Sequence, residues 1–79
     1  MRILFFAQLK DATKCDSVEI AVPAPVNADE LWAELVTKFP ALTAHRSSVR
    51  LAKNLEYTAS DARFSNADEV ALIPPVSGG

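Results

Sequence analysis

The last two residues of the chain, Gly78 and Gly79, are the residues whose types most clearly suggest chemistry. They are the only two glycines among 79 residues, and no turn at the chain end requires their conformational freedom. Because glycine has no side chain, two in a row can pass through a narrow channel and leave a terminal carboxylate open to attack. Activation as an acyl-adenylate would make that carboxylate reactive toward a sulfur nucleophile, giving a thiocarboxylate. The pair therefore predicts a C-terminal chemical handle, with Gly79 as the reacting residue.

The residues before this pair read Pro74-Pro75-Val76-Ser77 and favour an extended, polyproline-like start. Neither proline can donate a hydrogen bond to a strand, so a sheet should end before them. Six residues beyond Ile73 reach at most about 20 Å. We therefore expect a flexible tail over residues 74–79 that threads into a partner's pocket. The plainer alternative is a frayed end or a linker remnant.

The composition predicts one small domain over residues 1–79 and excludes several classes of protein. The net charge is −2, with 8 basic and 10 acidic residues. The basic residues are scattered, whereas a nucleic-acid surface needs a basic stripe, so we expect no nucleic acid as partner. The apolar runs are far shorter than the roughly 20 residues of a membrane span, so we expect no membrane contact. Without a signal-peptide cleavage pattern after the apolar start, we expect a cytoplasmic protein.

Other residues with reactive side chains have plainer explanations than catalysis or metal binding. Cys15 and His45 are each the only residue of their type. We interpret Cys15 as an incidental surface or half-buried thiol and His45 as a surface histidine. A single cysteine forms neither an internal disulfide nor a zinc site on its own. Asp29, Glu30 and Glu34 are better explained by helix capping and a solvated helix face. We therefore expect no metal site and no enzyme site within the domain itself.

The hydrophobic pattern predicts the elements that must position the tail. Residues 2–8 and 17–22 are predicted as two strands that form a hairpin, with a loop over 9–16. Residues 28–39 are predicted as a helix, because Leu31, Leu35 and Phe39 recur at helical spacing. Asn27 is its predicted cap, with Glu30 completing a capping box, and Trp32 is expected at or near the core. Pro40 should end the helix.

The second half of the chain predicts further strands and no second domain. Residues 49–53 alternate like a strand, 54–57 suggest a tight turn into a short strand, and 69–73 form the last strand. Residues 41–48 are expected to be a loop with a helical turn, and Phe64 should fill the core. The fold class is therefore α+β, a mixed sheet of four to five strands with one main helix packed across it. If the first and last strands pair, this is a β-grasp, ubiquitin-like fold.

Two segments carry a resemblance to a known family. The opening Ile3-Leu4-Phe5-Phe6-Ala7-Gln8-Leu9 resembles the first strand of the small, sulfur-carrier subunits of molybdopterin synthases. The closing run resembles the specific C-terminal signature of the same family, and it reads Asp68-Glu69-Val70-Ala71-Leu72-Ile73-Pro74-Pro75-Val76-Ser77-Gly78-Gly79. The helix and middle strands match only as a pattern. The resemblance implies a ubiquitin-like β-grasp fold and a function in molybdenum-cofactor synthesis.

The resemblance also implies partners and a reaction cycle. A ubiquitin-activating-like adenylyltransferase would adenylate Gly79 with ATP and Mg, and a sulfur donor would convert the adenylate to a thiocarboxylate. The charged carrier would dock on the large synthase subunit, usually as a heterotetramer, and donate sulfur to cyclic pyranopterin monophosphate. No cofactor would be bound permanently. The carrier would be non-catalytic alone and a subunit of a sulfurtransferase in the complex.

One position departs from the family pattern. Many members have glycine before the acidic pair that precedes the last strand, whereas this chain has Ala67. An alanine with positive φ would cost on the order of 1 kcal/mol. Either Ala67 bears this cost, or Asn66 takes the left-handed conformation in its place.

The alternation of side chains along the first and last strands predicts a docking face. Ile3, Phe5, Val70 and Leu72 should point into the core. The residues between them should then be exposed together behind the tail, and such an apolar patch usually marks a partner site. We expect it to bind both the large subunit and the activating enzyme, unless the loop after the helix covers part of it. The predicted partner-binding residues are Leu4, Phe6, Ala71, Ile73, Pro74, Pro75, Val76 and Ser77.

Three other functions remain open from the residues alone. The same carboxylate chemistry would serve a sulfur carrier for thiamine or for tRNA thiolation. A protein modifier, joined through Gly79 to lysines of other proteins, would use the same adenylate. A plain interaction domain with an incidental terminus is the remaining alternative.

Overall fold

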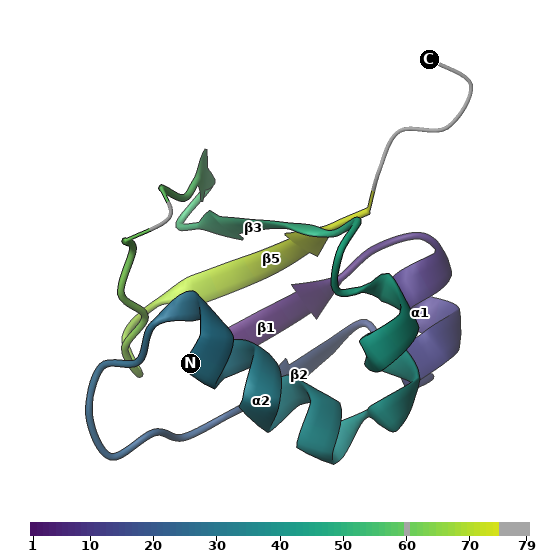
Figure 1. The fold of residues 1–79 in the computed structure, drawn as a ribbon, viewed down its shortest axis with the longest axis horizontal. Helices are drawn as coiled ribbons and strands as arrows, with labels where there is room; N and C mark the ends of the chain where they lie inside the picture. Colours follow the sequence, from purple (N-terminus) through teal and green to yellow (C-terminus); the bar gives the residue numbers. More distant parts are fainter. Residues whose placement is uncertain (60, 75–79) are drawn as a thin grey trace.

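The computed structural model describes residues 1–59 and 61–74, which form a five-stranded mixed sheet with one long helix across a face (Figure 1). The strand order is β2-β1-β5-β3-β4, with β1 and β5 parallel and the other neighbours antiparallel. This is the predicted α+β, β-grasp arrangement. In chain order the elements are β1 Arg2–Phe5, α1 Gln8–Thr13, β2 Ser17–Glu19, α2 Ala28–Lys38, the 3₁₀ helix η1 Pro40–His45, β3 Arg50–Lys53, β4 Glu56–Tyr57 and β5 Glu69–Ile73.

The first and last strands pair at the centre of the sheet, as predicted. Arg2 lies opposite Glu69 and Phe5 opposite Leu72, in parallel register. The C-terminal ends of both strands therefore lie at the same end of the sheet, where the arrows of β1 and β5 point in Figure 1. The chain leaves β5 at Ile73, so the root of the predicted tail lies beside the end of β1.

The core lies between the sheet and α2. The inward residues of β1 and β5 are fully or almost fully buried, and they meet Leu31, Trp32 and Leu35 of α2 in one apolar cluster. Phe64 is completely buried, as predicted for a residue that fills the core. Burial of this apolar surface is the main stabilising contribution available to a domain of this size. The four inward residues of the two strands are Ile3, Phe5, Val70 and Leu72.

Helix α2 begins with the predicted capping box. The side chain of Asn27 accepts a hydrogen bond from the Glu30 backbone N–H at 2.8 Å, and the Glu30 carboxylate accepts one from the Asn27 N–H at 3.0 Å. The helix ends at Lys38, one residue earlier than predicted, before Pro40 opens η1. Among the described residues, no helix has the length and apolar character required to cross a bilayer.

The prediction of a loop over residues 9–16 was wrong, because a short helix, α1, forms there. Leu9 and Thr13 lie one turn apart and are both buried, and the Thr13 hydroxyl donates to the Leu9 carbonyl at 2.9 Å. No side chain caps its N-terminus, where Ala7 has φ 51° and ψ −128°. The usual sequence signal of a helix start is therefore missing. Strand β1 accordingly ends at Phe5 and not at residue 8.

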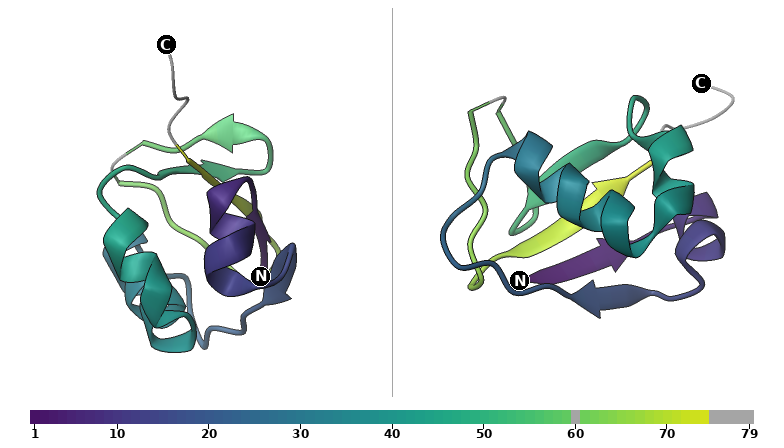
Figure 2. Two further views of the ribbon diagram at one scale, coloured as in Figure 1. Left: turned by 90° about the vertical axis from the view of Figure 1, so that its right-hand side faces the viewer. Right: turned by 60° about the horizontal axis from the view of Figure 1, so that its bottom comes forward.

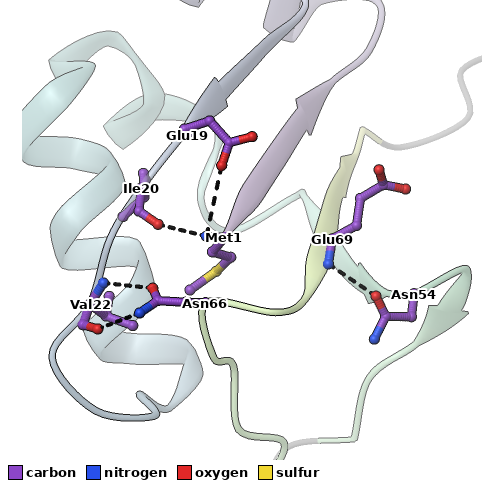
Figure 3. A network of polar contacts seen from close by, with 7 residues as sticks. All are labelled: Met1, Glu19, Ile20, Val22, Asn54, Asn66 and Glu69. Carbon is purple, nitrogen blue, oxygen red and sulfur yellow. Dashed lines mark hydrogen bonds and ion pairs between the residues drawn. The ribbon is translucent and has the colours of Figure 1, made fainter.

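The second strand is shorter than predicted, and the prediction for Asn66 was also wrong. β2 ends at Glu19, although Ile20 and Val22 beyond it are buried. The Asn66 side chain pairs with the Val22 backbone, accepting from its N–H and donating to its carbonyl, both at 2.8 Å (Figure 3). Asn66 and Ala67 are not among the described non-glycine residues with positive φ. Asn66 therefore serves through its side chain, and the turn needs no left-handed residue there.

Candidate partner-binding site

The face of the sheet opposite α2 carries the predicted apolar residues. Leu4 and Phe6 from the first strand and its end lie beside Ala71 and Ile73 of β5. Phe6 is 42% exposed and the other three are half-buried. Figure 2 shows α2 on one side of the sheet and no described helix over the other. The structure thus brings these four residues together, and we call this surface the open face.

The open face is hollowed, and the hollow includes residues that the sequence analysis missed. Its volume is about 280 Å³. Ala52 of β3, Tyr57 of β4 and Leu55 of the turn between them extend it across the sheet. Pairing of β3 with β5 sets Ala52 opposite Ala71, and the register across the two-residue turn sets Tyr57 opposite Ala52, so strand alternation with these two registers could have found both. Leu55 lies in the turn itself, where alternation gives no signal. The hollow is lined by Leu4, Phe6, Ala52, Leu55, Tyr57, Glu69, Ala71 and Ile73.

The root of the tail lies at one end of this hollow. Ile73 is the last residue of β5 and lines the hollow together with Phe6. Pro74 follows it and is half-buried. The other predicted site residues, Pro75, Val76, Ser77, Gly78 and Gly79, lie outside the described residues. The partner-binding role of the predicted residues stays a prediction.

Charged groups border the apolar hollow. The Arg50 guanidinium lies over the ring of Tyr57, 4.7 Å from its centroid, and Arg50 is the cross-strand neighbour of Ile73. At the opposite end of the same face, Arg2 lies opposite Glu69. The open face therefore combines an apolar centre with a polar rim, the usual anatomy of a protein–protein interface.

The two-residue turn between β3 and β4 is tied to the start of β5. The Asn54 backbone N–H donates to the Glu69 carbonyl at 2.8 Å. The Asn54 side-chain oxygen accepts from the Glu69 N–H at 3.0 Å, as Figure 3 shows. The Asn54 side chain also donates to Asp68 at 3.2 Å. The backbone N–H of Ser65, at 2.8 Å, lowers the pKa of the Asp68 carboxyl more than any other contact. Polar contacts to Asp68 and Glu69 thus hold the turn in place.

The remaining candidates lie away from the open face. Asp29 pairs with Arg46 at 2.6 Å, and Glu30 completes the capping box of α2, in agreement with their predicted helix-start roles. Cys15 is half-buried just after α1, and His45 ends η1. Within residues 1–59 and 61–74, no group of three histidine, cysteine, aspartate or glutamate residues is placed to hold a metal ion.

Comparison with known proteins defines the class to which this fold and this tail belong. The model of the ThiS family matches residues 3–79, nearly the whole chain and including Gly78 and Gly79. The chain therefore belongs to the ThiS family.

The individual relatives that this chain resembles are molybdopterin synthase sulfur carrier subunits. The chain is 39% identical over 79 residues to the molybdopterin synthase sulfur carrier subunit of Arabidopsis thaliana, covering all of this chain and 82% of that protein. It is 34% identical over 82 aligned positions to the Homo sapiens protein of the same name, covering all of this chain and 93% of that one.

Solved structures confirm the fold. SAMP1 from Haloferax volcanii superposes with a TM-score of 0.85 at 28% identity, over all of this chain and 98% of that one. A chain from the complex of subunits 1 and 2 of the molybdopterin-converting factor from Helicobacter pylori has a TM-score of 0.68. That match covers 99% of this chain and 96% of the other at 22% identity, and it supports the fold alone.

Proposed function

We propose that this chain is the sulfur-carrier subunit of a molybdopterin synthase and acts in molybdenum-cofactor biosynthesis. One observation carries the proposal: similarity to carrier subunits from a plant and from human spans the complete chain at 39% and 34% identity. The family match also runs through residue 79, so it includes the terminal glycines.

The proposed chemistry takes place on the carboxylate of Gly79, in two steps. An activating enzyme first joins the carboxylate to the α-phosphate of ATP, with Mg, and pyrophosphate leaves. A sulfur nucleophile supplied by a donor then attacks the acyl carbon, and AMP leaves with the bonding electron pair. The product is a thiocarboxylate whose sulfur is a soft nucleophile. Neither ATP nor Mg is a resident cofactor of the carrier in this scheme.

The proposed acceptor is cyclic pyranopterin monophosphate, bound by the large synthase subunit. The tail would enter the large subunit's active site while the open face docks beside it, and the Helicobacter pylori complex gives a precedent for such pairing in a related fold. A six-residue tail reaches at most about 20 Å, so the large subunit must lie close to Ile73 when it takes the terminus. Two carriers and two large subunits would form a heterotetramer, and the carrier would contribute no catalytic side chain of its own.

The proposal is tested by intact-mass spectrometry after incubation with ATP, Mg, an activating enzyme and sulfide. We expect a gain equal to the replacement of one oxygen by sulfur, and no gain when Gly79 is deleted. Addition of the large subunit and cyclic pyranopterin monophosphate should then return the carrier to its original mass while molybdopterin forms.

An activating enzyme that charges a related carrier under the same conditions is the positive control. No mass gain beside a working control would overturn sulfur transfer. Charging followed by transfer only to a thiazole precursor or to tRNA would assign the carrier to another thiolation pathway.

A second candidate function is supported by a different comparison. The chain is 28% identical to SAMP1 and 26% identical to small archaeal modifier protein 1 in a second crystal structure, both from Haloferax volcanii. An adenylated Gly79 could also acylate lysine side chains of other proteins. Conjugates of higher mass that disappear when Gly79 is deleted would establish protein modification, with or without sulfur transfer.

A further inference from the structure

The exposed large apolar side chains of the described residues gather at one place. They are Phe6, Leu55 and Tyr57, which are 42%, 93% and 62% exposed, and all three line the hollow of the open face. Isolated apolar side chains on a surface are ordinary, but a cluster around one hollow is characteristic of a binding surface. Leu55 is the most exposed of the three, and the sequence offers no structural reason for leucine at this position.

The backbone conformation at Leu55 is one that leucine does not favour. Asn54 and Leu55 form a two-residue hairpin turn with φ 51° and φ 74°. Such turns favour Asn-Gly, because glycine takes positive φ without a steric cost. A branched, apolar residue there is destabilising, and its almost complete exposure offers no compensating burial. A residue that breaks a local rule without a gain in stability points to a function.

The turn presents Leu55 from a fixed position. Three hydrogen bonds join Asn54 to Asp68 and Glu69, two of them to the Glu69 backbone at 2.8 and 3.0 Å. A side chain on a preorganised turn loses little freedom when a partner covers it. Leu55 therefore has the properties of an interface anchor, an apolar side chain on a rigid support.

The position of Leu55 relates it to the tail. The turn lies beside Glu69, where β5 begins, whereas the chain leaves β5 at Ile73. Four residue steps along a strand separate the two ends by about 13 Å. Because Leu55 and Ile73 line the same hollow, a protein that covers the hollow while it takes the tail would also meet Leu55.

We propose that Leu55 is an anchor for the large synthase subunit, at the end of the open face remote from the tail. It would act as a second anchor in addition to the tail itself. This inference rests on the proposed function, and the large subunit is the chosen occupant because the hollow is continuous with the root of the tail. The contact fits an apolar pocket on the large subunit. Two separated anchors would fix the orientation of the carrier, so that the tail enters in one register.

The decisive variant is Leu55→Gly, because the two possible roles of Leu55 predict different results. Glycine removes the steric cost of positive φ, so the melting temperature should rise by about 3 °C. Loss of the anchor should weaken binding of the carrier to the large subunit about tenfold, measured by isothermal titration calorimetry. A residue with a purely structural role would not combine higher stability with lower affinity.

Lys14→Gly is the matched control. Lys14 is also an exposed non-glycine residue in the left-handed region, with φ 62°, but it does not line the hollow. This variant should also raise the melting temperature and leave the affinity within a factor of two of the parent. Leu55→Met, which keeps an apolar side chain on the same backbone, should retain most of the affinity.

Several results would overturn the inference. Parent-like affinity of Leu55→Gly for a large subunit that binds the parent would remove Leu55 from the interface while leaving the proposed function intact. Slower thiocarboxylate formation with unchanged affinity would assign Leu55 to the activating enzyme. A concentration-dependent dimer of the parent, lost in Leu55→Gly, would assign it to a second copy of the chain. No binding of the parent to the large subunit would reject both the inference and the proposed partner.

Discussion

The two faces of the central strands carry similar apolar residues but differ in burial. Along β1 and β5, the residues that point toward α2 are buried to 1% exposure or less, whereas their neighbours in sequence remain partly exposed. Hydrophobicity alone does not distinguish the two sets, since Phe5 and Phe6 are adjacent and identical in type. The difference arises because the single long helix can cover only one face.

This comparison separates stability from recognition. Apolar surface covered by α2 stabilises the fold through burial, while apolar surface left uncovered contributes little until a partner buries it. Substitutions on the covered face should therefore change the free energy of unfolding. Substitutions on the open face, outside the Asn54-Leu55 turn with its positive φ angles, should change affinity for partners at nearly constant stability.

The largest effect is expected for Phe5→Ala. Phe5 is 1% exposed and makes an edge-to-face contact with Phe39, with ring centroids 5.5 Å apart. Removing a buried phenylalanine ring costs about 3–5 kcal/mol, a large part of the stability of a small domain. Urea denaturation followed by circular dichroism measures the loss. If Phe6→Ala destabilised the fold by a similar amount, the distinction between the faces would be wrong.

Phe6→Asp tests the open face in the opposite way. A carboxylate in the apolar hollow should lower affinity for the large subunit at least tenfold, or about 1.4 kcal/mol. The circular dichroism spectrum and urea midpoint should stay close to those of the parent, because Phe6 lies outside the core cluster. Unchanged affinity in calorimetry would exclude this face as the docking surface.

Asn27→Ala weakens only the element that covers the inner face. It removes the side-chain cap of α2 and should lower the free energy of unfolding by about 1 kcal/mol. Because Asn27 is remote from the hollow, affinity for the large subunit should not change in the folded variant. A matched Asn54→Ala variant should also lose stability, through its bonds to β5, and should in addition lower affinity by freeing the turn of Leu55.

Ala7→Gly tests the backbone conformation just after β1, where the chain turns from the sheet into α1. Ala7 has φ 51° and ψ −128°, a conformation that only glycine adopts readily. Relief of this strain, about 1–3 kcal/mol, should exceed the entropic cost of glycine in the unfolded chain, about 0.4–1 kcal/mol. The expected net gain is about 1 kcal/mol, measured by thermal and urea denaturation. A loss of stability would show that Ala7 carries no such strain.

The smallest effect concerns pH and the Asp68 carboxylate near the open-face turn. The pKa of Asp68 is lowered in the folded state, chiefly by the backbone N–H of Ser65. Its contribution to stability is therefore fully present above the unfolded pKa, near 3.8, and is lost as the pH falls through the lower folded pKa. Asp68→Asn should be less stable than the parent at pH 7, with a difference that shrinks below pH 4. A constant difference across this range would contradict the assignment.

Local patterns were sufficient for most elements of the fold. The apolar pattern in residues 2–8 and 69–73, the capping residues Asn27 and Glu30, and the proline after α2 are local signals. They gave β5 at its observed bounds, and they gave β1 and α2 with ends three residues and one residue too late. Helix α1 was missed because its start has no capping side chain. Its formation depends on tertiary contacts, because Leu9 packs in the core cluster.

The candidate site, too, was only partly predictable from local patterns in the sequence. Four residues of the open face followed from alternation along two strands, whereas Ala52, Leu55 and Tyr57 required knowledge that β3 lies next to β5. The role of Asn66 likewise depends on Val22, which is 44 positions away in the sequence. Such contacts between distant segments leave no periodic signal in the chain.

The sequence by itself determined the predicted reactive terminus, the core face of the central strands and the helix that covers it, because each depends on neighbouring residues and on local periodicity. Only the tertiary structure decided how far the open face extends and that Leu55 stands at its remote end on a rigid turn. The reason is physical: strand order and turn support come from hydrogen bonds between segments that the chain brings together only when it folds.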